Sequence, residues 1–80
     1  MYNTAHLNSQ HHVNMLITLN GKEKSLNENT TLIHLIEELG IADKRIAVEI
    51  NHEIIPKSKY ANYAVRDGDT IEIVHAIGGG

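Results

Sequence analysis

Residues 29–41 read NTTLIHLIEELGI, and this stretch decides the fold. The aliphatic side chains that recur at the spacing of one helical face are Leu32, Leu35, Ile36 and Leu39. Asn29 or Thr30 is expected to be the N-cap, since such side chains accept hydrogen bonds from the first helical turn. Gly40 stands where a left-handed C-cap belongs, and Ile41 beyond it can close the hydrophobic contact of that cap. We therefore expect one helix from Thr31 to Leu39.

Strand patterns flank this helix on both sides. The segments with alternating or short apolar runs are residues 15–20, 23–26, 46–51, 53–55 and 70–75. Asn20-Gly21 joins the first two, and this dipeptide tolerates the positive φ angles of a tight hairpin turn. Asn51-His52 is expected to form a second turn, and residues 66–69 a third in which Gly68 takes a positive φ. A helical turn is expected near residues 60–64.

The order of these elements predicts an α+β domain. The apolar face of the helix must cover one face of a mixed sheet of four to five strands. If the first and last strands pair, they run parallel at the centre of the sheet. We assign residues 15–76 to this domain. Residues 1–14 lack periodicity and are expected to be a disordered arm or an added extension, and residues 77–80 a flexible glycine tail.

Length and composition narrow the function. A chain of 80 residues fits one domain, and a deep substrate cleft is not expected in a domain of this size. The net charge of −3 and the lack of Phe and Trp disfavour nucleic-acid binding, and the acidic surface suits a basic partner. With no cysteine, a thiol nucleophile and Cys-ligated zinc are excluded. No apolar run approaches the roughly 20 residues of a membrane span, so a cytoplasmic protein without membrane contact is expected.

The chain ends in three glycines, Gly78, Gly79 and Gly80. Glycine-rich ends also arise by fraying or from tags, and the pattern alone leaves both interpretations open. A chain without Cβ atoms can thread a narrow channel of a partner enzyme. Transfer of AMP from ATP would turn the Gly80 carboxylate into a mixed anhydride, which a sulfur nucleophile can attack. Displacement of AMP would leave a thiocarboxylate, which carries sulfur without any cysteine.

From Met15 to Gly80 the sequence resembles the ThiS family, the sulfur carriers of thiamine biosynthesis. The segments that carry this resemblance are Ile17-Thr18-Leu19-Asn20-Gly21, Arg45-Ile46-Ala47-Val48-Glu49-Ile50-Asn51, Glu53-Ile54-Ile55-Pro56, Asp67-Gly68-Asp69 and Ile71 to Gly80. Many relatives have Asn-Gly where this chain has Asn51-His52, which leaves the geometry of that turn open. The resemblance implies the ubiquitin-like β-grasp fold and a protein that is a co-substrate rather than an enzyme.

The resemblance also implies partners and residue roles. Gly80 would be adenylated and thiocarboxylated, while Gly79 and Gly78 would thread into the partner. A ThiF-type adenylyltransferase would use ATP, and the carrier itself would bind no cofactor. Sulfur would come from a donor such as a cysteine desulfurase and pass to a ThiG-type thiazole synthase. Other functions stay open: a molybdopterin-type sulfur carrier, a ubiquitin-like protein modifier, and a β-grasp interaction module that ignores the tail.

Two further features concern surfaces. The six histidines show no spacing of a zinc site, so no metal site is expected. Leu16 and Val74 fall on the strand faces opposite the expected core, where Ala47 and Ile77 can join them. We expect these four residues to form an apolar patch that docks the adenylyltransferase.

Overall fold

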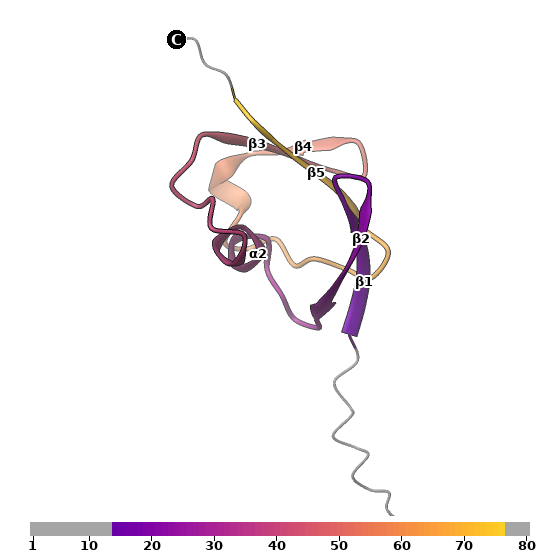
Figure 1. Ribbon diagram of the computed structural model, residues 1–80. Helices are drawn as coiled ribbons and strands as arrows, with labels where there is room; N and C mark the ends of the chain where they lie inside the picture. Colours follow the sequence, from indigo (N-terminus) through magenta and orange to yellow (C-terminus); the bar gives the residue numbers. More distant parts are fainter. Residues whose placement is uncertain (1–13, 77–80) are drawn as a thin grey trace, which may run out of the picture.

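The computed structural model describes residues 14–76 (Figure 1). Residues 1–13 and 77–80, which include most of the predicted arm and all of the predicted tail, lie outside the described residues. The elements in chain order are β1 (Asn14–Leu19), β2 (Lys22–Asn27), α2 (Leu32–Glu38), β3 (Ile46–Ile50), β4 (Glu53–Ile55), the 3₁₀ helix η1 (Lys57–Lys59) and β5 (Thr70–His75). Asn14, which was predicted to end the arm, is the first residue of β1 and pairs with Asn27.

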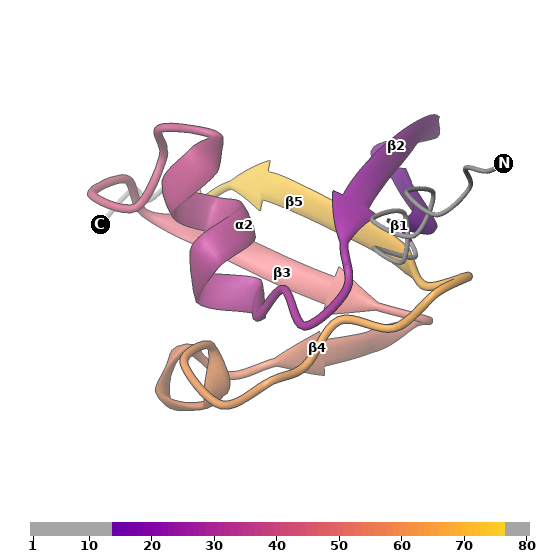
Figure 2. The same cartoon turned by 90° about the horizontal axis from the view of Figure 1, so that it is seen from below.

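The five strands form one mixed sheet in the order β2-β1-β5-β3-β4. β1 and β5 run parallel at its centre, with Thr18 opposite Thr70, and every other neighbouring pair is antiparallel. α2 lies across one face of the sheet (Figure 2). Within residues 14–76, the predicted α+β architecture, the parallel central pair and the single main helix are thus confirmed. This arrangement is the β-grasp fold.

Both predicted hairpin turns have the backbone that tight two-residue loops require. Asn20 and Gly21 have φ angles of 51° and 84°, and Asn51 and His52 have φ angles of 51° and 72°. Two successive positive φ angles match the right-handed twist of the flanking strands. His52 therefore adopts the conformation for which glycine is favoured, and the β3–β4 turn keeps its geometry without glycine.

The helix matches its prediction to within one residue at each end, but its N-cap does not. Thr31, rather than Asn29 or Thr30, is the N-cap, and its hydroxyl accepts a hydrogen bond from the His34 N–H at 3.3 Å. The Thr30 hydroxyl instead donates to the Asn27 carbonyl at 2.6 Å and closes the turn after β2.

The C-terminal cap of α2 forms as predicted. Gly40 has a φ of 75°, and its N–H donates to the Glu37 carbonyl at 3.0 Å. The Ile41 N–H donates to the Ile36 carbonyl at 3.3 Å, which completes a Schellman motif. Ile41 is partly buried against the core, so the cap also fixes where the chain turns back toward β3.

The segment between β4 and β5 supports the start of the helix. The predicted helical turn near residues 60–64 is wrong, because the only helical turn described there is η1, which ends at Lys59. The carbonyls of Tyr60 and Tyr63 instead accept hydrogen bonds from the N–H groups of Ile33 (3.0 Å) and Leu32 (2.8 Å). First-turn N–H groups have no partner within a helix, so these bonds satisfy two of them.

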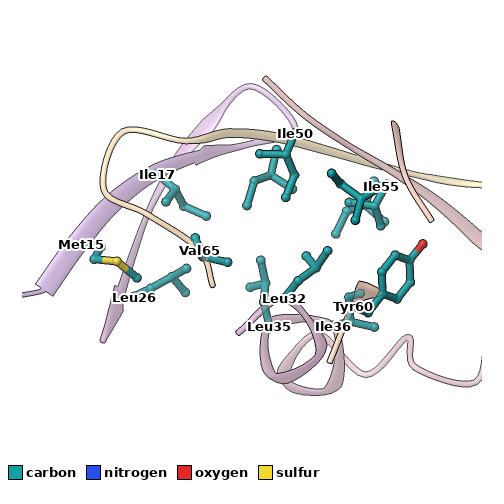
Figure 3. Close-up of a cluster of buried hydrophobic side chains, with 13 residues drawn as sticks. Met15, Ile17, Leu26, Leu32, Leu35, Ile36, Ile50, Ile55, Tyr60 and Val65 are labelled. Carbon is teal, nitrogen blue, oxygen red and sulfur yellow. The ribbon is translucent and has the colours of Figure 1, made fainter. Parts of the chain in front are cut away.

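The core lies between α2 and the sheet. Figure 3 shows Ile17, Ile50 and Ile55 of the sheet facing the side chains of α2. The largest side chains that are fully buried are Ile17, Leu32, Leu35, Ile36, Val48, Ile50 and Ile71. Leu39, predicted to share the buried helical face, is 36% exposed at the C-cap. Within residues 14–76, no helix is long and apolar enough to cross a membrane.

Candidate functional site

The predicted sulfur-carrying residue, Gly80, and its neighbours Gly78 and Gly79 lie outside the described residues, so their roles stay predictions. The structure does describe the strand that leads to them. His75 is the last residue of β5 and pairs with Ile46. The Ala76 N–H then donates to the Arg45 carbonyl at 2.9 Å. We call residues 75–76 the tail root, since the predicted tail continues from this point.

The strand that ends at the tail root is held on both of its edges. Along one edge, β3 pairs with β5 from Ile71 to His75. Along the other edge, pairing with β1 ends at Leu19 and Ile71. Beyond that point, the Asn20 side chain accepts from the Ile73 N–H at 2.8 Å and donates to the Ile73 carbonyl at 3.3 Å. An amide side chain thus continues the ladder toward the tail root.

A polar network fixes the opposite end of β5. Asp69 is 6% exposed, and its carboxylate accepts hydrogen bonds from the Arg66 N–H at 2.9 Å and from the Asn51 side-chain amide at 3.0 Å. Asn51 in turn accepts from the Thr70 N–H at 2.9 Å. Asp67 accepts from the Leu16 N–H at 2.7 Å. Sequence reasoning identified this segment as a turn but missed that Asp69 is buried, which depends on its pairing with the distant β3–β4 turn.

The sheet face opposite α2 carries the predicted contact residues, but it does not bring all of them together. Val74 is 57% exposed and pairs directly with Ala47. Leu16 is 48% exposed on the same face, yet its carbonyl accepts a hydrogen bond from the N–H of Gly68, which lies in the turn before β5 and six residues before Val74. Six residues along a strand span about 20 Å, so Leu16 is not part of a patch with Val74. Ile77 lies outside the described residues.

A residue that the prediction missed completes the patch. Ile54 of β4 is 75% exposed, and it pairs with Glu49, which in turn pairs with Glu72. A three-residue strand shows too little alternation for its faces to be assigned from sequence. We define the sheet-face patch as Ala47, Ile54 and Val74.

A shallow hollow of about 180 Å³ lies within this patch. Its lining includes Glu49 and Glu72 beside the three apolar residues. The two carboxylates are directly opposite each other on antiparallel strands, an arrangement that destabilises a sheet when nothing offsets it. Neither carboxylate accepts a side-chain hydrogen bond from another residue of the described part of the chain. The hollow therefore combines exposed apolar surface with negative charge that a cation could neutralise.

The described histidines do not form a metal site. His34 lies on α2, His52 in the β3–β4 turn and His75 at the tail root. Among residues 14–76, no three His, Asp or Glu side chains gather closely enough to hold a metal ion.

Comparison with known proteins identifies the family. The family model described as "ThiS family" matches residues 15–80, which is nearly the whole chain and includes the three terminal glycines. This chain belongs to the ThiS family. The sulfur carrier protein ThiS of Bacillus subtilis strain 168 is 39% identical over 66 residues, which cover 81% of this chain and 100% of that protein. The resemblance inferred from the sequence is thereby confirmed.

Solved structures agree with this assignment. The crystal structure of the thiamine biosynthesis protein ThiS from Geobacter metallireducens matches this ThiS-family chain with a TM-score of 0.73 and 30% identity. The match covers 82% of this chain and 100% of that structure. The fold described above is therefore that of the family.

A longer relative has a different name. A thiazole synthase of Paramagnetospirillum magneticum is 48% identical over 66 residues, which cover 82% of this chain. The matched region is 20% of that protein, so this ThiS-family chain spans about a fifth of its length. A ThiS-like segment thus occurs within a protein named for the synthesis of thiazole.

Proposed function

We propose that this chain is a sulfur carrier of thiamine biosynthesis and that the Gly80 carboxylate carries the sulfur. The observation that carries the proposal is the family match, which extends to Gly80. Within this region, the sulfur carrier protein ThiS of Bacillus subtilis is matched over 100% of its own length. The hollow on the sheet face has a volume of only about 180 Å³, which is small beside the roughly 300–1,000 Å³ of an ordinary ligand pocket. The chemistry is therefore assigned to partner enzymes that act on the tail.

The proposed cycle has two steps. A Gly80 carboxylate oxygen attacks the α-phosphorus of ATP on an adenylyltransferase and releases pyrophosphate. Hydrosulfide, released by a thiol from the persulfide of a donor such as a cysteine desulfurase, then attacks the acyl adenylate and expels AMP, which leaves the thiocarboxylate. This chemistry requires a free carboxylate on Gly80. It requires no cofactor bound to the carrier, since ATP is held by the partner.

Thiazole synthase is the proposed recipient of the sulfur. The relative that is itself named a thiazole synthase contains a segment 48% identical to this chain, which supports a partnership between the two activities. Placing a carrier and its recipient in one polypeptide raises the effective concentration of each for the other. The same partnership between separate chains would depend on a docking surface.

Intact mass spectrometry tests the carrier function. The protein is incubated with ATP, cysteine and an extract of its own host, beside a variant that lacks Gly80. We expect a mass gain equal to the exchange of one oxygen for sulfur, and we expect the deletion to abolish it. If no gain occurs in an extract that thiocarboxylates a known carrier, the proposal fails. Stable conjugates of higher mass would indicate a protein modifier instead.

We assign docking of the adenylyltransferase to the sheet-face patch. The patch includes Val74, next to the tail root, so a partner that receives the tail can cover both. Val74→Glu should weaken the complex by more than about tenfold, because it places a charge in an apolar contact. Leu16→Glu is the matched control, since Leu16 is similarly exposed but distant, and its affinity should stay within about twofold. Equal affinities for the two variants would contradict this assignment.

A further inference from the structure

A second hollow, of about 110 Å³, lies on the helix side of the sheet. Its apolar floor includes Ile36 at the end of α2, Ile46 at the start of β3 and the ring of Tyr60. Three cationic side chains also line it: Lys44, Arg45 and Lys57. We call this hollow the basic cleft.

The charge of the basic cleft is unlike that of the chain as a whole. The protein carries a net charge of −3, yet three of its seven Lys and Arg residues line this one hollow. The side-chain hydrogen bonds between residues of the described region are made by Asn, Asp and Thr, so these cations have no such bond there. All three are exposed, and Asp43 is the acidic neighbour of Lys44 along the chain. Within residues 14–76, the cleft therefore offers positive charge that is not engaged in side-chain hydrogen bonds, above an apolar floor.

The basic cleft lies beside the tail root. The carbonyl of Arg45 holds the Ala76 N–H at 2.9 Å, and Ile46 pairs with His75. Val74, one residue before His75, belongs to the sheet-face patch on the other face of the same strand. Two surfaces thus flank the end of β5: one is apolar with two carboxylates, and the other is apolar with three cations.

We infer that the basic cleft binds an acidic side chain on an apolar segment of the adenylyltransferase. This inference rests on the proposed function, in which that enzyme takes up the tail. Opposite charges on the two sides of the tail root would match a partner whose channel entrance is acidic on one side and basic on the other. Complementary charge sets the orientation of a complex and the rate of encounter more than it sets raw affinity. The tail would then enter the channel in one orientation.

Charge-reversal variants test the inference on the full chain. Arg45→Glu and Lys57→Glu each reverse one charge of the cleft. Lys24→Glu makes the same change of net charge on β2, an edge strand separated from β3 by β1 and β5. Binding of the purified adenylyltransferase from the same organism is measured by calorimetry at low and at high salt. Thermal unfolding of each variant verifies that it folds.

We expect each cleft variant to bind about tenfold more weakly than the unsubstituted chain at low salt and to lose much of its salt dependence. Lys24→Glu should stay within about twofold. An equal loss of affinity in Lys24→Glu and in the cleft variants would show that only the net charge of the chain matters, and this would overturn the inference. Unchanged binding by the cleft variants would overturn it as well. A third result would also overturn it: the unsubstituted chain binds inorganic phosphate, and the cleft variants lose this binding while their affinity for the enzyme stays unchanged.

The mass assay separates this inference from the proposed function. At saturating adenylyltransferase, the cleft variants should still gain sulfur, because Gly80 is unchanged. Normal sulfur transfer with unchanged affinity would overturn only the role of the cleft. Failure of the unsubstituted chain to bind the enzyme or to gain sulfur would overturn both.

Discussion

Replacing Asp69 with alanine should destabilise the domain more than any other change of a polar side chain described here. The carboxylate is buried and accepts two hydrogen bonds, from the Arg66 N–H and from the Asn51 amide. A hydrogen bond to a charged group contributes about 1.5–3 kcal/mol, and removing the acceptor breaks two such bonds, both of which are partly buried. At the lower figure for each bond, Asp69→Ala should reduce the free energy of unfolding by about 3 kcal/mol. This is a large share of the total for a small domain.

Urea unfolding followed by circular dichroism measures this loss. With a slope of about 1 kcal/mol per molar urea, the midpoint should fall by about 3 M. Asp69→Asn should lose less, because the amide keeps one acceptor while its NH₂ group faces a donor. Asp43→Ala is the matched control, since Asp43 is exposed and makes no side-chain hydrogen bond with another described residue. A loss for Asp69→Ala within about 1 kcal/mol of this control would refute the network as the anchor of β5.

Three further predictions concern the core, the helix cap and pH. Leu35→Ala, at a side chain with no exposure, should cost about 3 kcal/mol of unfolding free energy in the same assay, whereas Ile54→Ala, at 75% exposure, should stay within about 0.5 kcal/mol. Gly40→Ala should cost about 1 kcal/mol, because the φ of 75° is strained for alanine although a Cβ would meet nothing within 4 Å; an unchanged midpoint would contradict this cap. Burial raises the pKa of Tyr60, so the folded state holds the phenol proton more tightly than the unfolded chain does, and stability should be full below the unfolded pKa of 10.0 and fall above it. Tyr60→Phe should flatten this fall in urea midpoints measured across the alkaline range, and an identical slope in both proteins would contradict the role of burial.

Local patterns predicted the helix and the strands because each contains its own signal. The spacing of Leu32, Leu35 and Ile36 followed by Gly40 fixes α2 to within one residue at each end. The N-cap was wrong because Asn29, Thr30 and Thr31 are all suitable by residue type, and tertiary contacts decide among them. The segment from residue 60 to 65 has no hydrophobic periodicity, because its path is set by the hydrogen bonds that its carbonyls accept from the first N–H groups of α2.

The sequence pattern predicted which face of the sheet the exposed apolar residues occupy, but not how far apart they lie on it. Alternation placed Leu16 and Val74 on the exposed face correctly, as their exposed fractions of 48% and 57% show. Only the register of β1 against β5 shows that they lie at opposite ends of the sheet. Ile54 was missed for a related reason, since its neighbours come from pairing between strands. The role of Gly80 came from the family resemblance and stays a prediction.

The central position of β5 has a consequence for the making of the protein. A ribosome releases the chain from its N-terminus, so the strand that pairs with both β1 and β3 is the last described element to emerge. Until residues 70–75 are available, the β1–β2 hairpin and the β3–β4 hairpin have no common neighbour, and the core beneath them stays open. Such long-range pairing is also slow to form. A nascent chain of this family should therefore complete its sheet only after residues 70–75 have been synthesised, and a chain that stops before them would leave its core open.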